Sequence, residues 1–295
     1  MQTHRFRHAA AIAASVLIAA FGLAMSGGAW AARVGVLSNN FVEEAAANFS
    51  SQLSGHSFTP IDLRTSVPTL LSLTTNFDVL LVFEDGTFVN SSLVGNLAAS
   101  FASTGRTVIV GTFYDQDRSD GSPTNTPHGW GTLENLDPNT TDGVGTPYAL
   151  RSLDPASIVV HPLTEGVTAL FSKQYAGGND AKPGTVVVAN WAQLNARGRP
   201  DPVIAYRLTG SACVIHVAIA PNYPEIGVVG TDFGGDFYRL WQNAFDFGAG
   251  HCTSAVTAPP DAGAAPVPTL SGPLLALTAL LLAGLAAGAV RARRR

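Results

Sequence analysis

Alternation between short apolar runs and helical stripes constrains the fold of this chain more than any other feature of its sequence. Four apolar runs predict strands: 34–37, 58–63, 78–83 and 107–110. The run at 78–83 does not alternate with polar residues, which is typical of a strand covered on both faces. Helical spacing appears between the runs, as in Val42, Ala45, Ala46, Phe49 and Leu53. With strands about 25 residues apart, the pattern predicts an α/β domain with a flavodoxin-like, mainly parallel sheet and helices on both faces.

The second half of the body adds three apolar runs and a closing helix. Turns rich in Gly and Pro separate the runs 185–189, 203–206 and 213–219, so antiparallel additions to the sheet are expected. The closing helix is predicted to begin at an Asp232 cap. Its apolar stripe is Phe233, Phe237, Leu240, Trp241, Ala244 and Phe245. In the first helix, Asn40 is the predicted N-cap, and Glu43 completes a capping box.

Between the two halves, residues 113–153 interrupt the pattern with many Gly, Pro, Asp, Asn and Thr residues. So long a segment inside a compact domain is either a functional loop or a surface insertion, and the sequence leaves both open. Trp130 and Tyr148 are suited either to stacking on sugars or to pinning the loop to the domain.

The N-terminus has the organisation of a signal peptide. A basic segment at 4–8 precedes an apolar segment at 9–25, and Ala-Trp-Ala at 29–31 is a small-x-small cleavage site. Cleavage is predicted after Ala31, which assigns residues 1–31 to the signal peptide. An uncleaved N-terminal anchor is the alternative interpretation.

The C-terminus is typical of a membrane anchor. Residues 273–290 carry no charge, and at about 1.5 Å per residue they form a helix of about 27 Å, enough to cross a bilayer core. The arginines within 291–295 favour a cytoplasmic C-terminus, and the Ala- and Pro-rich stretch 254–266 is a flexible linker. The alternative is a terminal helix packed inside a globule. We therefore expect an exported protein, anchored in the inner membrane by a transmembrane helix and facing the periplasm.

A short motif lies directly before this apolar segment: Val267, Pro268, Thr269, Leu270 and Ser271. The order of motif, apolar helix and terminal arginines resembles a bacterial IPTL-CTERM sorting tail, a relative of the PEP-CTERM tail. The resemblance covers residues 267–295. It implies an exosortase-type membrane protease as a partner, and a cell-surface location once the tail is processed.

Charge and cysteine usage agree with export. The chain has 21 acidic and 17 basic residues, and six of the basic ones lie in the two terminal segments, which leaves an acidic body. Nucleic acid is therefore not an expected partner, because phosphate binding needs clustered Lys and Arg. Cys213 and Cys252 are the two cysteines, and an even count in an oxidising compartment predicts a disulfide. Two buried thiols are the alternative.

The body, residues 32–253, also resembles a known superfamily. The motifs are Asp-Val-Leu-Leu-Val at 78–82, Gly-Arg-Thr-Val-Ile-Val-Gly at 105–111, His-Pro-Leu-Thr-Glu-Gly-Val at 161–167 and Leu-Trp-Gln-Asn-Ala at 240–244. They are similar to class I glutamine amidotransferase-like domains, close to trehalose-utilisation-protein-like ones. Active members carry a nucleophilic Cys after the strand that matches 107–110. Thr112 stands at that position here, so the resemblance implies that amidotransferase chemistry is absent, and no catalytic residue is predicted.

Ligands in open α/β sheets bind at the carboxyl ends of the strands. The candidate ligand-binding residues there are Glu84, Asp85, Thr112 and Tyr114. Asp115, Asp117 and Asp120 alternate with other residues before a glycine, as the carboxylates of calcium-binding loops do. They form either a candidate calcium site or a solvated polar turn. His128, His161 and His216 are either a metal cluster or separate hydrogen-bonded histidines.

These patterns together predict an exported, non-catalytic domain that binds an unidentified ligand or partner, with no cofactor unless calcium is bound. A metal-assisted hydrolase that uses Asp115, Asp117 and Asp120 is the alternative function.

Overall fold

The computed structural model describes residues 31–64, 66–86, 91–114, 129–140, 150–173 and 178–252. The chain divides into two compact units, Met1–Thr253 and Ser254–Arg295, and every described residue belongs to the first.

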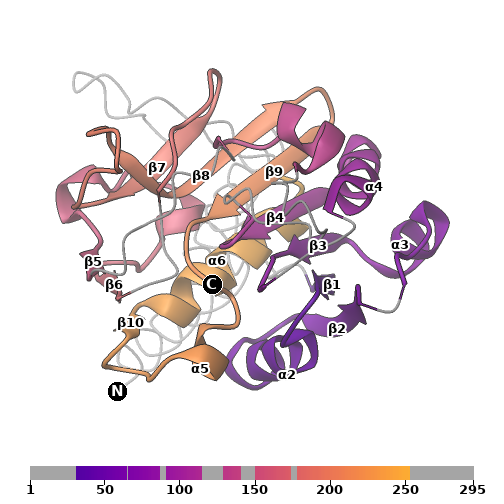
Figure 1. Ribbon diagram of the computed structural model, residues 1–295, viewed down its shortest axis with the longest axis horizontal. Coiled ribbons are helices and arrows are strands. Elements are labelled where there is room, and N and C mark those ends of the chain that lie inside the picture. Colours follow the sequence, from indigo (N-terminus) through magenta and orange to yellow (C-terminus); the bar gives the residue numbers. More distant parts are fainter. Residues whose placement is uncertain are drawn as a thin grey trace, which may run out of the picture. The chain divides into compact units, whose positions relative to one another are not determined.

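A seven-stranded sheet forms the centre of the domain, in the order β2-β1-β3-β4-β9-β8-β7 (Figure 1). Its strands are β1 (Arg33–Ser38), β2 (Ser57–Asp62), β3 (Val79–Val82), β4 (Thr107–Gly111), β7 (Val186–Trp191), β8 (Asp201–Thr209) and β9 (Ala212–Val217). The first five strands in the spatial order pair in parallel, whereas β8 is antiparallel to both of its neighbours. The structure therefore confirms a mainly parallel sheet with antiparallel additions.

Helices cover both faces of this sheet. They are α2 (Val42–Gln52), α3 (Leu70–Asn76), α4 (Ser91–Ser103), α5 (Tyr223–Ile226) and α6 (Phe237–Ala249). One buried cluster joins α2 and α6 to the sheet through Phe49, Trp241 and Ile109. A second cluster joins α3 and α4 to the other face, where Phe101 packs with Val108. The two helix pairs lie on opposite sides of the strands (Figure 1).

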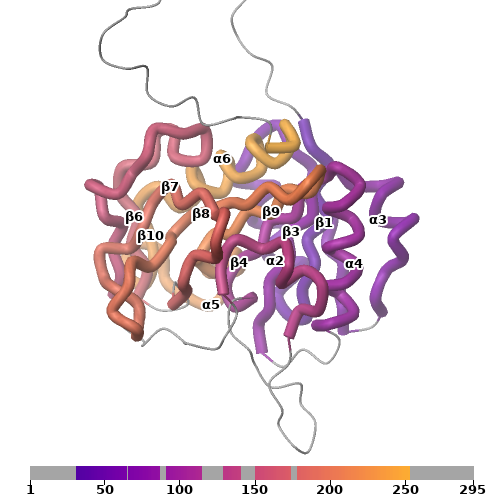
Figure 2. The backbone as a smooth tube through the Cα atoms, turned by 90° about the horizontal axis from the view of Figure 1, so that it is seen from above, coloured from indigo at the N-terminus to yellow at the C-terminus, as the bar shows by residue number. Residues whose placement is uncertain are grey.

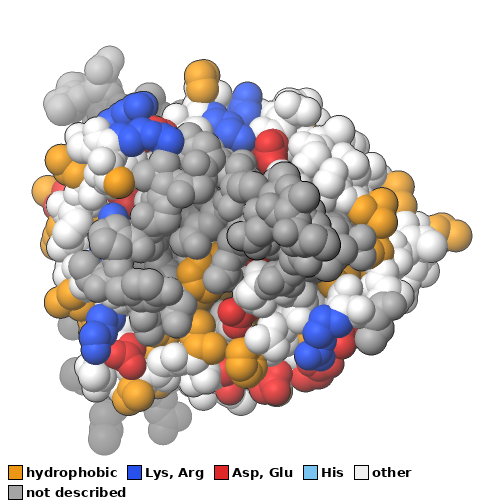
Figure 3. All heavy atoms as spheres, viewed as in Figure 1, with side chains coloured by type: hydrophobic (Ala, Val, Ile, Leu, Met, Phe, Trp, Pro, Cys, Tyr) orange, Lys and Arg blue, Asp and Glu red, His pale blue; other side chains and the backbone are white. Residues whose placement is uncertain are grey.

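A three-stranded antiparallel sheet, in the order β10-β6-β5, lies at the end of the domain opposite α3 (Figures 1 and 2). It consists of β5 (Arg151–Ser152), β6 (Leu170–Ser172) and β10 (Phe233–Gly235). Three short 3-10 helices complete the described elements: η2 (Gly131–Asn135), η3 (Pro155–Ser157) and η4 (Pro162–Thr164). Lys and Arg side chains on the face in Figure 3 lie in separate groups around its rim.

The predicted start of the closing helix is wrong. Phe233 lies in β10, opposite Ser172 of β6, and α6 begins four residues later, with Asp236 as the N-cap residue. The Asp232 carboxylate instead accepts a hydrogen bond of 2.9 Å from the Val228 amide. The positive φ of Gly235, 75°, separates strand from helix. The remainder of the predicted stripe is buried as expected.

The predicted capping box of the first helix is also wrong. Phe41, with a φ of 51°, is the N-cap residue of α2, and no side chain caps it. Asn39, two residues before Phe41, accepts a hydrogen bond of 2.9 Å from the Asp85 amide through its side chain. The turn from β1 into α2 therefore contacts a distant loop and has no local side-chain cap.

The predicted disulfide is present and joins Cys213 of β9 to Cys252, just after α6. Beside it, Thr107 of β4 donates a hydrogen bond of 2.8 Å to the Gly248 carbonyl. The end of α6 is therefore fixed to the middle of the large sheet.

Several predictions fall outside the described residues: nearly all of the signal peptide 1–31, the linker 254–266, the sorting motif from Val267 to Ser271, and the transmembrane segment 273–290. Within the part of the chain that the structure describes, no helix combines the length and apolar character needed to cross a membrane.

Candidate functional site

Polar residues gather where the parallel strands end. Because β1, β3, β4 and β9 run in the same direction, the residues that follow them meet at one edge of the sheet. Asn39 follows β1, Glu84 follows β3, Thr112 follows β4 and Asn222 lies beyond β9. Asn39 is 7% exposed, and the other three have no exposed surface. Together with Asp85, these residues form the carboxyl-edge cluster.

Hydrogen bonds connect the loops that carry this cluster. The Asn222 side-chain amide donates to the Asp85 carboxylate over 2.9 Å, and the Asp85 amide donates to Asn39 Oδ1. The Phe113 amide donates to the Glu84 carbonyl over 3.1 Å, and the Thr112 amide donates to the Ile219 carbonyl over 3.4 Å. Of the predicted binding residues, the structure therefore brings Glu84, Asp85 and Thr112 together.

Two buried polar atoms of the cluster lack hydrogen-bond partners among the described residues: Thr112 Oγ1 and Asn222 Oδ1. The Asp85 carboxylate accepts from the amide nitrogen of Asn222, so the remaining oxygen of that side chain serves only as an acceptor. Buried polar groups without partners typically cost about 1–3 kcal/mol each, and most are paired in folded proteins. Two such atoms follow the neighbouring strands β4 and β9, which makes this edge the candidate binding site.

Thr112, directly after β4, has no described base within hydrogen-bond distance of its hydroxyl. Its hydroxyl makes no hydrogen bond to any described residue. Gly111 before it packs so closely that an added Cβ would lie 2.8 Å from the Pro221 ring. Both cysteines are in the disulfide. The described surroundings of Thr112 hold a hydroxyl in place without activating it.

Tyr114 belongs to a neighbouring buried network. Its hydroxyl donates to the Asp137 carboxylate over 2.8 Å, and its ring lies 4.8 Å from that of Trp130, measured between ring centres. Trp130 has no exposed surface and donates from its indole nitrogen to the Tyr114 carbonyl. In this structure Trp130 pins the segment that follows β4 to the domain.

Lys182 and His216 complete that network. The Lys182 ammonium forms an ion pair with Asp137 and donates to the Glu134 carbonyl over 2.7 Å. Burial raises the pKa of Asp137 to about 7, although the charge and hydrogen bond of Lys182 and the hydrogen bond from Tyr114 lower it in part. Burial, helped by the charge of Lys182, lowers the pKa of His216 to about 3. His216 is therefore neutral at physiological pH, and its Nδ1 contacts the side-chain amide of Asn139.

The described histidines take separate structural roles. Nδ1 of His161 accepts a hydrogen bond of 3.1 Å from the Leu163 amide and so caps η4. His216 lies inside β9. Within the described ranges, no group of three or more His, Cys, Asp or Glu side chains could hold a metal ion. The other predicted metal ligands lie outside the described residues: Asp115, Asp117, Asp120 and His128.

Sequence reasoning missed Asn39 and Asn222. Each lies within a few residues of the end of a predicted strand, at 34–37 and 213–219, and this position is the signal that could have identified them.

Comparison with known proteins gives a resemblance in fold. No protein-family model matches this chain, and no curated protein sequence matches it. Among solved structures, a cytoplasmic protein of Salmonella typhimurium LT2 is similar, with 11% identity, a TM-score of 0.47, and coverage of 73% of this chain and 99% of that one. A ThuA-like protein from Bacteroides uniformis has 12% identity and a TM-score of 0.44, over 72% of this chain and 89% of that one. Likenesses of this degree carry no activity over to the present chain.

Proposed function

We propose that this chain is an exported envelope protein whose α/β domain binds a small ligand, without catalysis, at the carboxyl edge of its sheet. The observation that supports this most is the pair of buried, unpartnered atoms Thr112 Oγ1 and Asn222 Oδ1. Because Asn222 Oδ1 only accepts hydrogen bonds, the matching ligand carries donors, such as hydroxyl or amino groups.

Binding without catalysis is supported by the surroundings of Thr112. A threonine hydroxyl attacks a substrate only when a neighbouring base takes its proton. No described base lies within hydrogen-bond distance of it, and the histidine nearest in the strand order, His216, is held by Asn139. We infer that Thr112 contacts a ligand rather than reacting with it.

Export is supported by the sequence and by the disulfide. The signal-peptide pattern at 1–31, the apolar segment 273–290 and the motif 267–271 indicate export, membrane anchoring and sorting. The bond between Cys213 and Cys252 suits an oxidising compartment. We propose an inner-membrane protein that faces the periplasm and reaches the cell surface if an exosortase-type protease processes its tail.

A thermal-shift screen of the purified full chain tests the binding proposal. The panel contains sugars, polyols, amines and amino acids, because these classes supply donors. A ligand at a hundred times its Kd stabilises the protein by about 2.7 kcal/mol, which raises the melting midpoint measurably. The expected result is a stabilising compound whose effect disappears in Thr112→Val. A compound that stabilises both proteins equally binds elsewhere, and a panel without effect on either would contradict the proposal.

A further inference from the structure

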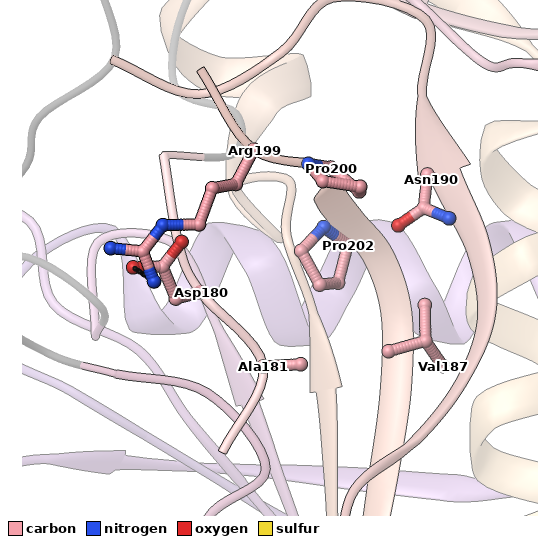
Figure 4. A pocket seen from close by; sticks show the side chains of 7 residues that line it. All are labelled: Asp180, Ala181, Val187, Asn190, Arg199, Pro200 and Pro202. Carbon is pink, nitrogen blue, oxygen red and sulfur yellow. Dashed lines mark ion pairs between the residues drawn. The ribbon is translucent and has the colours of Figure 1, made fainter. Parts of the chain in front are cut away.

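A pocket of about 270 Å³ shares no residue with the carboxyl-edge cluster. Its apolar wall comes from Val187 of β7 and from Pro200 and Pro202 around the start of β8. Its polar groups are Asp180, Asn190 and Arg199. Asn190 lies on one side, the pair of Arg199 and Asp180 lies on the other, and Pro202 lies between them (Figure 4).

The loop that carries Arg199 is fixed by a buried asparagine. Asn195, 4% exposed, accepts from the Arg199 amide through its side chain over 3.0 Å and donates to the Arg199 carbonyl through its own amide over 2.9 Å. Its side-chain nitrogen donates to Asp180 over 2.7 Å. The loop that carries Arg199 and the Asp180 carboxylate are therefore held in fixed relative positions before any ligand binds.

The backbone on the same side, just before Asp180, is fixed by a buried carboxylate. Asp201 has no exposed surface and accepts hydrogen bonds from the amides of Gly178 and Asn179. It also forms an ion pair with Arg151. This arrangement sets the position of the backbone that leads into Asp180, so the side of the pocket formed by Arg199 and Asp180 is built around buried polar contacts.

Most of the hydrogen-bonding groups in the pocket that remain available to a ligand are donors. The Asp180 carboxylate already accepts from Asn195 on one oxygen, while Arg197 at 2.7 Å and Arg199 at 3.2 Å share the other. Asp180 is the single partner of the Arg199 guanidinium among the described residues, and the Arg199 side chain is 61% exposed. A guanidinium has five N–H donors, so most of those on Arg199 are available. The Asn190 amide likewise makes no side-chain hydrogen bond to a described residue.

We propose that this pocket binds a carboxylate ligand with a small apolar body. The ligand carboxylate pairs with Arg199, for which a planar carboxylate is the matching partner. Its apolar body lies against Val187, Pro200 and Pro202, and Asn190 bonds a polar group at its far end. The pocket volume suits one ring or one amino-acid side chain. Such a ligand is either a free organic acid or the carboxyl terminus of a protein chain.

Ligand-observed fluorine NMR on the full chain tests this with 4-fluorobenzoate and its neutral analogue 4-fluorobenzamide. For so few non-hydrogen atoms, a Kd on the order of millimolar is expected for the carboxylate. Arg199→Gln should weaken 4-fluorobenzoate about tenfold. Arg64→Gln is the matched control, because Arg64 is also about half exposed and paired with one aspartate, Asp62. Asn190→Asp, of nearly the same shape, should weaken the carboxylate by charge repulsion and leave the amide unaffected.

The two ligand sources are separated by adding N-acetylphenylalanine, which carries a peptide group beside its carboxylate. Binding at least threefold tighter than that of 4-fluorobenzoate supports a chain terminus, and equal binding supports a free acid. The proposal is overturned if 4-fluorobenzamide binds as tightly as 4-fluorobenzoate, or if Arg199→Gln behaves like Arg64→Gln. Neither outcome affects the carboxyl-edge cluster, whose test uses Thr112→Val.

Discussion

Asn222 and Asp85 are joined by a hydrogen bond of 2.9 Å across two strands that are not neighbours in the sheet. Asn222 lies beyond β9 and Asp85 follows β3, while β4 lies between them. The bond therefore spans the end of β4, where Thr112 lies. It joins the loops after β3 and β9, on either side of the loop that carries Thr112.

Removing this bond should damage both stability and binding. Asn222→Ala takes a charge-assisted donor from Asp85, and we expect the free energy of unfolding to fall by about 1–3 kcal/mol. Any ligand found by the thermal-shift screen should lose its effect. Asn76→Ala is the control, because among the described residues its side-chain amide bonds only the Ser72 carbonyl, on the exposed side of α3. Urea denaturation measures both changes, and equal small losses in the two variants would argue against a structural bridge at the edge.

The disulfide should contribute strongly to stability. Cys213 and Cys252 are 39 positions apart, and closing a loop of that length is worth about 3–4 kcal/mol in the chain-entropy model. The double variant Cys213→Ala with Cys252→Ala should lose that amount in denaturant unfolding. Thiol titration of the denatured, unreduced protein should find no free thiol, and two thiols per chain would refute the bond.

Asp137 and His216 give the stability opposite dependences on pH. The pKa of Asp137 is raised from 3.8 to about 7 by burial, so its stabilising contribution is present below pH ~4 and is lost as pH rises through about 7. The pKa of His216 is lowered from 6.5 to about 3, so its contribution is present above pH 6.5 and is lost as pH falls toward 3. Between about pH 4 and 6.5 the two effects oppose each other.

Asp137→Asn should isolate the contribution of Asp137 to this pH dependence. The difference in free energy of unfolding between variant and native protein should shift in favour of the variant as pH rises from about 4 to about 7, by at most about 1.4 kcal/mol per pH unit, and stay constant above about pH 8. Urea unfolding at several pH values measures it, and His216 cancels because both proteins contain it. A difference independent of pH would show that Asp137 is not protonated in the folded protein.

Introducing charged residues into the apolar segment 273–290 tests whether this segment anchors the protein in the membrane. Replacing Leu281 and Leu282 by Arg should cost several kcal/mol of insertion free energy. Cell fractionation should then find the variant outside the membrane pellet. Replacement of the same two residues by Ile is the control and should leave the protein in the pellet. A double-Arg variant that still sediments with membranes would show that 273–290 is not the anchor.

The large sheet could be predicted because its signals are local. Buried parallel strands such as β3 and β4 are continuous apolar runs, and Val42, Ala46 and Phe49 mark one helix face. The start of α6 could not be predicted in this way, because Asp232 and Asp236 are both suitable caps. Pairing of Phe233 with Ser172, a contact between distant segments, decides between them.

The candidate site could likewise be predicted only where its signals are local in the sequence. Glu84, Asp85 and Thr112 directly follow strands, so their meeting at the carboxyl edge follows from parallel pairing. The role of Asn222 depends on a bond to a residue 137 positions away. The pocket beside Arg199 depends on the loop around Asn195, which shows no local pattern in the sequence.

Binding at the carboxyl edge requires that buried polar atoms there remain free for a ligand. Thr112→Val tests it most directly, because it replaces an unpartnered hydroxyl with a methyl group of similar shape. Thr107→Val is the matched control: Thr107 is equally buried in β4, but its hydroxyl donates to the Gly248 carbonyl over 2.8 Å. The measurement is the free energy of unfolding of both variants and the native protein, without ligand, by urea denaturation. We predict that Thr107→Val loses about 1–2 kcal/mol while Thr112→Val keeps or slightly gains stability. A loss in Thr112→Val as large as that in Thr107→Val would show that the Thr112 hydroxyl is already paired in the protein and is not free for a ligand.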